Sequence, residues 1–470
     1  MSGKRDPVAD PVRFVDARLG AAPLLRKAAH YVFPDHWSFL LGEIALYSFV
    51  VLVATGTYLA LFFEPSSHER VYHGSYGPLD GQVASDAYIS AMRLSFDVPA
   101  GLLTRQTHHW AALVFVAAIV VHVMRVFFTG AFRKPRELNW VIGVTLLALA
   151  VLEGFLGYSL LDDLLSGMGL AIAYGVATSI PGVGGQLATL LWDGRFPGSD
   201  HVWPRLFIGH VFLLPAVLGA LIALHLAILM RQHHTQFPGR GRTERNVVGT
   251  PLWPGYALRT LGWLFAVAAV LVLLGGLVQI NPIWIWGPYE PWQSTNGAQP
   301  DWFLGWLIGA LRITPPLEPR FAGHTWIGNP FFGGLLFPTV CFALLYFWPW
   351  LEQRFVTRDF RRHELLDRPR DNPLRMAIGA GFFTWVTTVF VAGAADRILV
   401  TIGFPYTGEV WFFRVAVVVA PPVVAALTYA ACRQLQRSEV HPLRGFTGGR
   451  VRRTPGGGFT AEGERGVARE

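Results

Sequence analysis

The stretch that decides the fold runs from Arg105 to Arg125 and reads RQTHHWAALVFVAAIVVHVMR. It is an apolar run with histidines near its start and near its end. Since helical residues turn by about 100° and rise by about 1.5 Å, His108 and His122 lie about 40° apart around a helix and about 21 Å apart along it. His109 lies about 140° from His122 around the same helix. The histidine that shares a face with His122 is therefore His108.

A single histidine at membrane depth has two explanations of equal weight, a hydrogen bond to a neighbouring helix or a functional role. Two histidines on one face favour a role, because polar side chains inside the bilayer are costly and usually mark function. Imidazole is a common axial ligand of haem iron. A haem site would require a second helix with matching histidines.

Composition indicates an all-α integral membrane protein. The chain has 470 residues, of which 52% are hydrophobic and only 15% charged. Apolar windows of about twenty residues predict eight transmembrane helices, at 39–63, 107–128, 140–161, 206–230, 258–280, 331–350, 376–397 and 411–432.

The basic residues set the predicted orientation. They cluster in the N-terminal segment, at 133–136, at 240–245, at 354–375 and in the C-terminal tail. With eight spans all five clusters fall on one side, which the positive-inside rule makes cytoplasmic, with both termini there. Membrane orientation thus explains the net charge of +8, and no nucleic-acid partner is indicated.

Four segments are expected along the chain. They are a cytoplasmic segment at 1–36, a four-helix domain at 37–235, a second four-helix domain at 236–435 and a disordered cytoplasmic tail at 436–470. The tail is rich in Gly and Arg and poor in apolar residues. The chain lacks a CxxCH motif, so any haem here is not attached as a c-type haem.

The span at 206–230 supplies the matching histidines. His210 and His225 are fifteen residues apart, about 60° from a shared face and about 22 Å along an ideal helix, and Pro215 between them can kink the helix. This span and the one at 107–128 both run from outside to inside. His108 and His210 are therefore expected at the outer depth and His122 and His225 at the inner depth, as two bis-histidine haem b sites in the first four-helix bundle.

Four glycines repeat the histidine spacing. Gly42 and Gly56 in the first span, and Gly143 and Gly157 in the third, are each fourteen residues apart. A glycine leaves space where a flat macrocycle passes a backbone, although ordinary packing between membrane helices also uses small residues.

Two arginines flank the histidines of the opening stretch. Arg105 and Arg125 lie near opposite interfaces, where guanidinium groups could pair with haem propionates. Anchoring at the cytoplasmic interface explains Arg125 equally well, but it does not explain Arg105.

At about residues 30–435 the chain resembles cytochrome b of the cytochrome bc complexes, the membrane quinol:cytochrome c reductases. The motifs that carry the resemblance are RQTHHW, HVMRVFFTGAFRKPRELNW, GHVFLLP, LHLAILM and FLGYS. The fifteen-residue histidine spacing and TGAFRKPREL are similar to the photosynthetic branch. FPDHWSFLLGEIALYSF and HTQFPGRGRTE are similar to the actinobacterial version, whose complexes typically oxidise menaquinol.

The resemblance implies an outer quinol-oxidation site with a Pro-Glu-Trp-Tyr motif, which here reads Pro300-Asp301-Trp302-Phe303. A carboxylate there accepts a proton from quinol, and Asp has a shorter reach than Glu. From the residues alone, Asp301 is better explained as a helix N-cap or first-turn acid. Phe303 lacks the family's hydroxyl, and Leu161 stands where the family commonly has a proline.

An inner quinone-reduction site is expected beside the inner haem. Its candidates, chosen by position, are Trp37, Ser38, Arg231, His233 and His234. Anchoring at the interface explains the last three equally well.

The resemblance also implies a Rieske iron–sulfur protein and a c-type cytochrome as partners, the membrane quinone pool as substrate, a homodimeric complex and a place in the cytoplasmic membrane. The function expected is quinol oxidation on the outer side of the membrane, coupled to electron transfer across the membrane and to proton translocation. Two alternatives remain at this point. One is a di-haem membrane anchor of another quinone-linked oxidoreductase, although such anchors usually have fewer spans; the other is a proton-coupled secondary transporter.

Overall fold

The computed structural model describes the chain except for residues 1–13, 15, 21, 294–299, 399, 439–449, 454–458 and 463–470. In this described part, eight helical segments are long and apolar enough to cross a membrane. They are Trp37–Ala60, Gly101–Phe128, Glu137–Ser159, Val202–Gln232, Leu252–Leu277, Phe332–Val356, Pro373–Gly393 and Tyr406–Ser438. The prediction of an all-α protein with eight transmembrane helices is confirmed.

These spans contain the helices α3 (Leu40–Ala60), α5 (Gly101–Phe128), α6 (Glu137–Ser159), α9 (Val202–Ile208), α10 (Leu214–Gln232), α11 (Ala257–Leu277), α14 (Phe337–Leu351), α15 (Pro373–Gly393) and α17 (Tyr406–Ser438). The shorter helices are α2 (Ala22–Ala29), α4 (Asp86–Phe96), α7 (Leu164–Thr178), α8 (Gly184–Trp192), α12 (Ile283–Trp286), α13 (Gly305–Ile313) and α16 (Ala395–Ile398). Short antiparallel pairs join β1 (Val32–Phe33) to β4 (Thr250–Pro251), β2 (Glu69–Val71) to β3 (Val83–Ser85), and β5 (Arg320–Phe321) to β6 (His324–Thr325).

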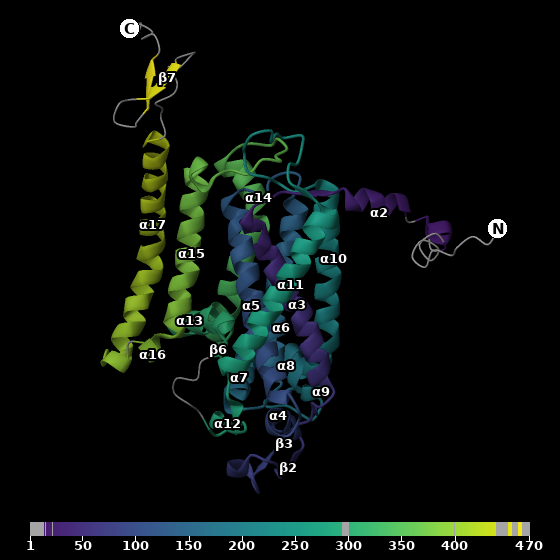
Figure 1. Cartoon of the computed structure of the whole chain (residues 1–470). Helices are drawn as coiled ribbons and strands as arrows, with labels where there is room; N and C mark the ends of the chain where they lie inside the picture. The colour runs from purple at the N-terminus through teal and green to yellow at the C-terminus, as the bar shows by residue number, and fades with distance from the viewer. Residues whose placement is uncertain are drawn as a thin grey trace, which may run out of the picture.

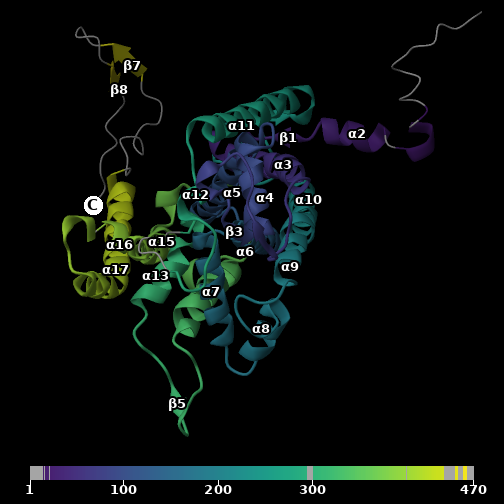
Figure 2. The same ribbon diagram turned by 90° about the horizontal axis from the view of Figure 1, so that it is seen from below.

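The long helices form two groups that stand side by side (Figure 1). In the first group α3 packs on α5, α6 packs on α10, and α11 lies against α3 and α5. In the second, α15 packs on α17 and α13. The view along the helices separates the α15–α17 group from the bundle around α5 (Figure 2). Helix α2 and the end of α17 lie at one end of the molecule, and α4, α8, α12 and β2 lie at the other (Figure 1).

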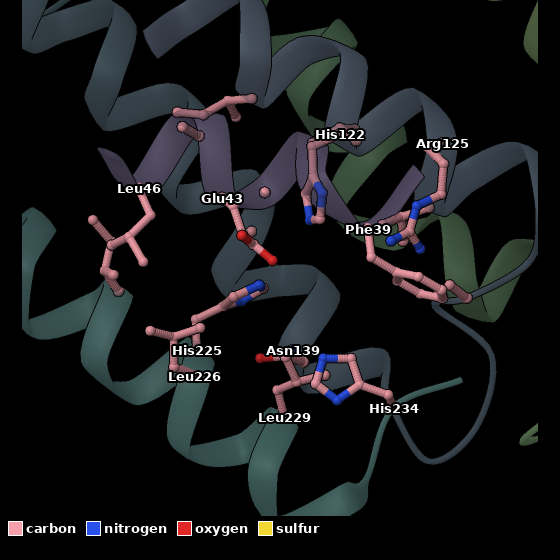
Figure 3. Close-up of a pocket in the computed structure, with 18 of the residues that line it drawn as sticks. Phe39, Glu43, Leu46, His122, Arg125, Asn139, His225, Leu226, Leu229 and His234 are labelled. Carbon is pink, nitrogen blue, oxygen red and sulfur yellow. The ribbon is translucent and has the colours of Figure 1, made fainter. Parts of the chain in front are cut away.

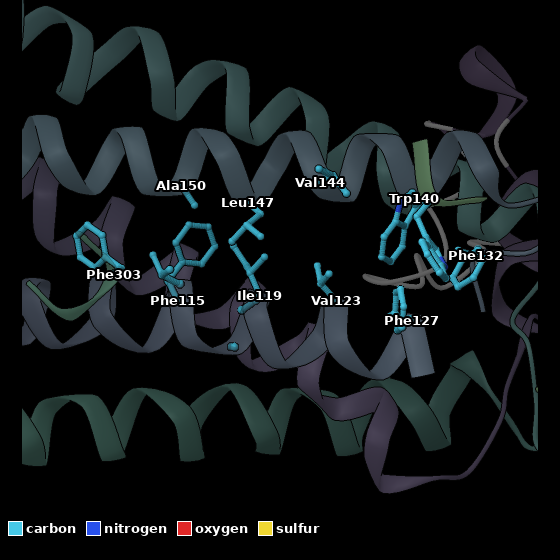
Figure 4. Packing of buried hydrophobic residues seen from close by; sticks show 14 of the residues in the cluster. Phe115, Ile119, Val123, Phe127, Phe132, Trp140, Val144, Leu147, Ala150 and Phe303 are labelled. Carbon is cyan, nitrogen blue, oxygen red and sulfur yellow. The ribbon is translucent and has the colours of Figure 1, made fainter. Parts of the chain in front are cut away.

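The largest buried apolar cluster lies between α5 and α6 (Figure 4). It consists of side chains that recur at helical spacing on the facing sides of these two helices. Members include Phe115, Ile119, Val123, Phe127, Trp140, Val144, Leu147 and Ala150, joined by Phe303 from the segment before α13. This packing fixes the rotation of α5, and therefore the direction in which its histidines point.

Three chain segments meet at the end of the molecule where α4 and α12 lie. Ser85 donates a hydrogen bond to Asp162 Oδ2 at 2.6 Å, and Tyr88 donates one to the carbonyl of Ile283 at 3.2 Å. Asp163 and Pro288 form an isolated antiparallel β-bridge. Asp162 is almost fully buried, and burial raises its carboxyl pKa from 3.8 to about 7. We call this contact of segments the outer junction, because this end is the predicted outer side.

Buried ion pairs join the two helix groups at the opposite end. Arg375 at the start of α15 makes hydrogen bonds with Glu352 at 2.9 and 3.0 Å, and both side chains are almost fully buried. Asp367 pairs with Arg375 at 2.7 Å and with Arg133 at 3.0 Å. Loss of one partner of a buried ion pair is costly, because it leaves a buried charge without compensation. These pairs therefore hold the second group of helices against the first.

The structure differs from the sequence-based expectation at several boundaries. Helix α5 begins at Gly101 rather than 107, and α17 continues to Ser438, past the expected end of its span at 432. Within the tail expected to be disordered, β7 (Arg450–Arg453) pairs with β8 (Phe459–Glu462), where β-branched and aromatic residues favour strands. The rest of that expected tail, at 439–449, 454–458 and 463–470, lies outside the described residues.

Candidate functional site

The outer histidine pair consists of His108 on α5 and His210 in the segment between α9 and α10. The two rings face a shared space. The ring centres of His108 and His210 are 6.2 Å apart, with the ring planes at 82°. Thr55 donates its hydroxyl hydrogen to Val51, so it accepts from His108 Nδ1 at 2.9 Å. Both rings therefore have Nδ1 occupied, since His210 Nδ1 lies 2.9 Å from Glu153 Oε1. A hydrogen bond at Nδ1 orients an imidazole so that Nε2 is available to a metal.

A π-turn corrects the register of the second histidine helix. Residues Gly209–Leu213 form one turn of π-helix between α9 and α10, just before Pro215, which has no N–H to donate. A π-turn contains one extra residue relative to an α-helix. The fifteen-residue spacing between His210 and His225 therefore acts as fourteen, which gives the same offset of about 40° as between His108 and His122.

The inner histidine pair lines a cavity of about 410 Å³ at the end of the bundle opposite the outer junction. His122 projects from α5 and His225 from α10 toward this cavity (Figure 3). The outer pair lines a separate cavity of about 230 Å³. The structure thus brings the four histidines together as the sequence pairs them by depth.

Each of the four glycines faces the histidine at its own depth. A Cβ atom on Gly56 would lie 3.0 Å from Cε1 of His108, and one on Gly157 would overlap His210. Those on Gly42 and Gly143 would lie 3.2 Å from His122 and 3.7 Å from His225. The missing side chains therefore leave space beside the imidazole rings rather than between closely packed helices.

The residues present fit two haem groups held by paired imidazoles. Arg105 is buried at the outer cavity, and its Nε and Nη2 atoms have no hydrogen-bond partner among the residues that the structure describes. Arg125 lines the inner cavity, where its Nε donates to the Ser38 carbonyl at 3.3 Å. A haem would supply propionates for both arginines. In the part of the chain described, no three His, Cys, Asp or Glu side chains gather as a metal cluster.

Asp301 in the Pro300–Phe303 motif lies at the outer cavity and does not cap its helix. Its Oδ1 atom is 2.7 Å from Nε2 of His109, with both side chains largely buried. Its side chain makes no capping hydrogen bond to the turn that follows. His109 lies about 140° from His122 around the helix. In this direction its ring reaches Asp301.

The other motif residues have distinct positions. Phe303 is buried against Gly154 and lines the outer cavity, while Trp302 is partly exposed. Leu161 lines the same cavity. After it the chain turns through Asp162, whose φ of 51° lies in the left-handed region.

The five inner-site candidates do not gather. His234 lines the inner cavity, and burial beside Arg125 and Arg136 lowers its pKa to about 3. It is therefore neutral near pH 7. Ser38 is buried and offers its carbonyl to Arg125. Trp37, Arg231 and His233 are exposed and do not line the cavity.

Sequence reasoning missed a carboxylate at this cavity. Glu43, in the first turn of α3, accepts a hydrogen bond from Tyr256 and another from Thr260 at 2.8 Å. All three residues line the inner cavity. The available signal was an acidic residue inside an apolar span, because such residues are rare in membranes and usually functional.

The chain is similar to proteins of one known family. The family model for "Cytochrome b(N-terminal)/b6/petB" matches residues 113–288. The cytochrome bc1 complex cytochrome b subunit of Mycobacterium tuberculosis is 49% identical over 447 residues, which is 95% of this chain and 81% of that protein. The subunit of the same name from Streptomyces coelicolor is 45% identical over 447 residues, 95% of this chain and 82% of that protein.

A chain of a solved structure titled "Hyperthermophilic respiratory Complex III" superposes with a TM-score of 0.65 at 20% identity, covering 89% of this chain and 100% of that chain. At this identity the superposition supports the fold alone. The sequence identities and the coverage of the curated relatives show the family: this chain belongs to the cytochrome b subunits of cytochrome bc1 complexes.

Proposed function

We propose that the chain is the cytochrome b subunit of a quinol:cytochrome c reductase, which oxidises quinol at the outer cavity and reduces quinone at the inner cavity. The observation that carries the proposal is the pairing of His108 with His210 and of His122 with His225 at two cavities, each pair flanked by its own glycines. When bound there, two b haems would carry electrons across the membrane.

At the outer cavity this chain's residues would receive quinol and one of its protons. Asp301 is the candidate acceptor, because its carboxylate lines the cavity and needs only hydrogen-bond reach to the quinol hydroxyl. His109 holds Asp301 in place at 2.7 Å. The buried rings of Phe303 and Tyr158 line the same cavity.

The finer parts of the proposal follow from family membership. A Rieske iron–sulfur protein would take one electron from quinol and pass it to a c-type cytochrome subunit, and the complex would be a homodimer. The chain would lie in the cytoplasmic membrane with both termini inside. The common end of α2 and α17, together with the basic clusters, supports that orientation.

The domain limits at 36, 235 and 435 also remain a proposal. The segment at 37–235 would be the di-haem unit and the segment at 236–435 the unit that carries the Pro300–Phe303 motif. The two groups of helices support this division, although α11 of the second unit packs on the first.

The test is spectroscopic and kinetic. Reduced-minus-oxidised spectra of the purified complex should contain two b-haem components, and quinol should reduce cytochrome c in a reaction that an outer-site inhibitor blocks. Protein without haem would refute the proposal. Two b haems without inhibitor-sensitive cytochrome c reduction would instead favour a membrane anchor of another oxidoreductase.

A further inference from the structure

The inner cavity extends beyond the four-helix bundle. Besides His122 and His225, its walls include residues from β1, from the segment after α10 and from the start of the α11 span. These residues are Phe33, Pro34, His234, Thr235, Tyr256 and Thr260. Under the proposed function, the quinone would bind against this wall of the cavity, next to the histidines.

Glu43 is the acidic residue in the cavity wall. In Figure 3 its side chain points toward the cavity. Thr260 donates to Oε2 at 2.8 Å and Tyr256 donates to Oε1, and both donors are neutral. They hold the carboxyl group in place at the cavity wall.

Polar groups connect Glu43 with the cytoplasmic end of the bundle. The guanidinium of Arg259 lies 5.3 Å from the ring centre of Tyr256. Arg259 in turn pairs with Asp35 at 2.8 Å, and about half of each of these two side chains is exposed. The exposed pair is open to solvent, and Arg259 lies against Tyr256, which donates its hydrogen bond to Glu43.

We propose that Glu43 is a catalytic proton donor for quinone reduction in the inner cavity, and that Tyr256 is its positioning residue. The inference rests on the proposed function, which supplies the quinone and its two electrons through the b haems. Reduction to quinol consumes two electrons and two protons. Glu43 gives one proton at a time to a quinone carbonyl oxygen, becomes a carboxylate, and regains its proton from water at the Asp35–Arg259 pair.

The experiment isolates the inner cavity in the purified complex. With an outer-site inhibitor bound, a short-chain menaquinol reduces the inner haem through the inner cavity, which is the reverse reaction and requires Glu43 to accept a proton. We expect Glu43→Gln to slow this reduction at least tenfold. We also expect the infrared difference spectrum between oxidised and reduced complex to lose its carboxyl band, a signal that does not depend on turnover.

Glu137→Gln is the matched control, since Glu137 is also a first-turn glutamate, in α6, but does not line the cavity. It should retain the rate and the band. If Glu43→Gln lowers the haem content, the Tyr256→Phe variant is measured in its place. Its ring keeps the stacking on Phe33, with ring centres 3.8 Å apart, while the hydroxyl is lost. This variant should slow reduction severalfold and shift the band.

A Glu43→Gln complex with full haem content, an unchanged rate and an unchanged band would overturn the inference while leaving the proposed function intact. An unchanged rate and band in Tyr256→Phe would do the same where Glu43→Gln does not assemble. A wild-type complex without b haems would refute the proposed function itself, and the inference with it.

Discussion

At the scale of single residues, the four glycines leave space beside the four cavity histidines. The four glycines differ in how closely they approach their histidines. At Gly157 an added Cβ would overlap the ring of His210, whereas at Gly143 it would be in ordinary contact with His225 at 3.7 Å. The same substitution is therefore expected to have different effects at the two depths.

We expect Gly157→Ala to remove most of the outer b-haem component, because the new methyl group displaces the His210 ring. Gly143→Ala is the matched control and should retain both components, since its methyl group meets only a van der Waals contact. Reduced-minus-oxidised spectra measure both. Equal haem loss in the two variants would contradict a steric role for Gly157.

The second residue-scale prediction concerns Asp301. Asp301→Asn should slow quinol oxidation by about 10²- to 10⁴-fold, the usual contribution of a general base, with normal haem content. The amide still reaches His109 but cannot take a proton. The measurement is pre-steady-state quinol oxidation. Asp80→Asn, at an exposed acid between β2 and β3, should have the wild-type rate. A wild-type rate in Asp301→Asn would remove the proton role.

At the scale of elements, the π-turn at Gly209–Leu213 explains a spacing that an ideal helix does not. The turn contains the extra residue, so His210 and His225 return to the same relative orientation as the pair on α5. Pro215 was the expected source of distortion. The structure instead places the register correction in the turn directly before it.

A deletion tests this explanation. Removal of Phe212, an exposed residue in the π-turn, should convert it to an α-turn and retain both haems, because the remaining fourteen residues keep the offset of about 40°. Insertion of one alanine after Phe212 should instead lose a haem, because one extra residue rotates His210 by about 100°. Reduced-minus-oxidised spectra measure how many b-haem components each of the two variants retains. If the deletion lost a haem and the insertion kept both, the explanation would be wrong.

At the scale of the whole molecule, the outer junction connects segments that are far apart in the sequence. Asp162 is its buried ionisable centre. Burial is the main cause of its raised carboxyl pKa, Ser85 partly opposes it by donating a hydrogen bond, and Asp163, Glu290 and Glu69 raise it further by repulsion. The junction is therefore sensitive to pH.

The direction of this dependence follows from linkage. The pKa of Asp162 is about 7 in the folded protein and 3.8 ordinarily, so the folded state binds the proton more tightly. Its contribution to stability is complete below about pH 4 and is lost as the pH rises toward 7, at up to about 1.4 kcal/mol per pH unit. Asp162→Asn should abolish this slope and raise the unfolding midpoint above the wild-type value near pH 8.

Thermal unfolding in detergent, from about pH 5 to pH 8, measures the slope. The exposed Asp80→Asn variant should follow the wild-type curve. If Asp162→Asn unfolded with the wild-type pH dependence, the junction would not depend on protonation of this carboxyl group.

Much of the molecule could be predicted from local sequence. Hydropathy predicted all eight spans, and the helical repeat placed His108 and His122 on one face and left His109 on another. These features depend on residues within one helix, where the rise and rotation per residue are nearly constant. The glycine spacing is local for the same reason, and it predicted which side of α3 and α6 faces the histidines.

Tertiary structure alone decided the contacts between helices. The contact of His109 with Asp301 joins residues 192 positions apart, and that of Glu43 with Tyr256 joins residues 213 apart. The π-turn and the position of His234 at the inner cavity also appear only after packing. Such contacts depend on how each helix is rotated against its neighbours, which is set by side-chain packing over the whole bundle. Sequence by itself therefore predicted the spans and the pairing of the four histidines, and the tertiary structure determined which acids line the two cavities.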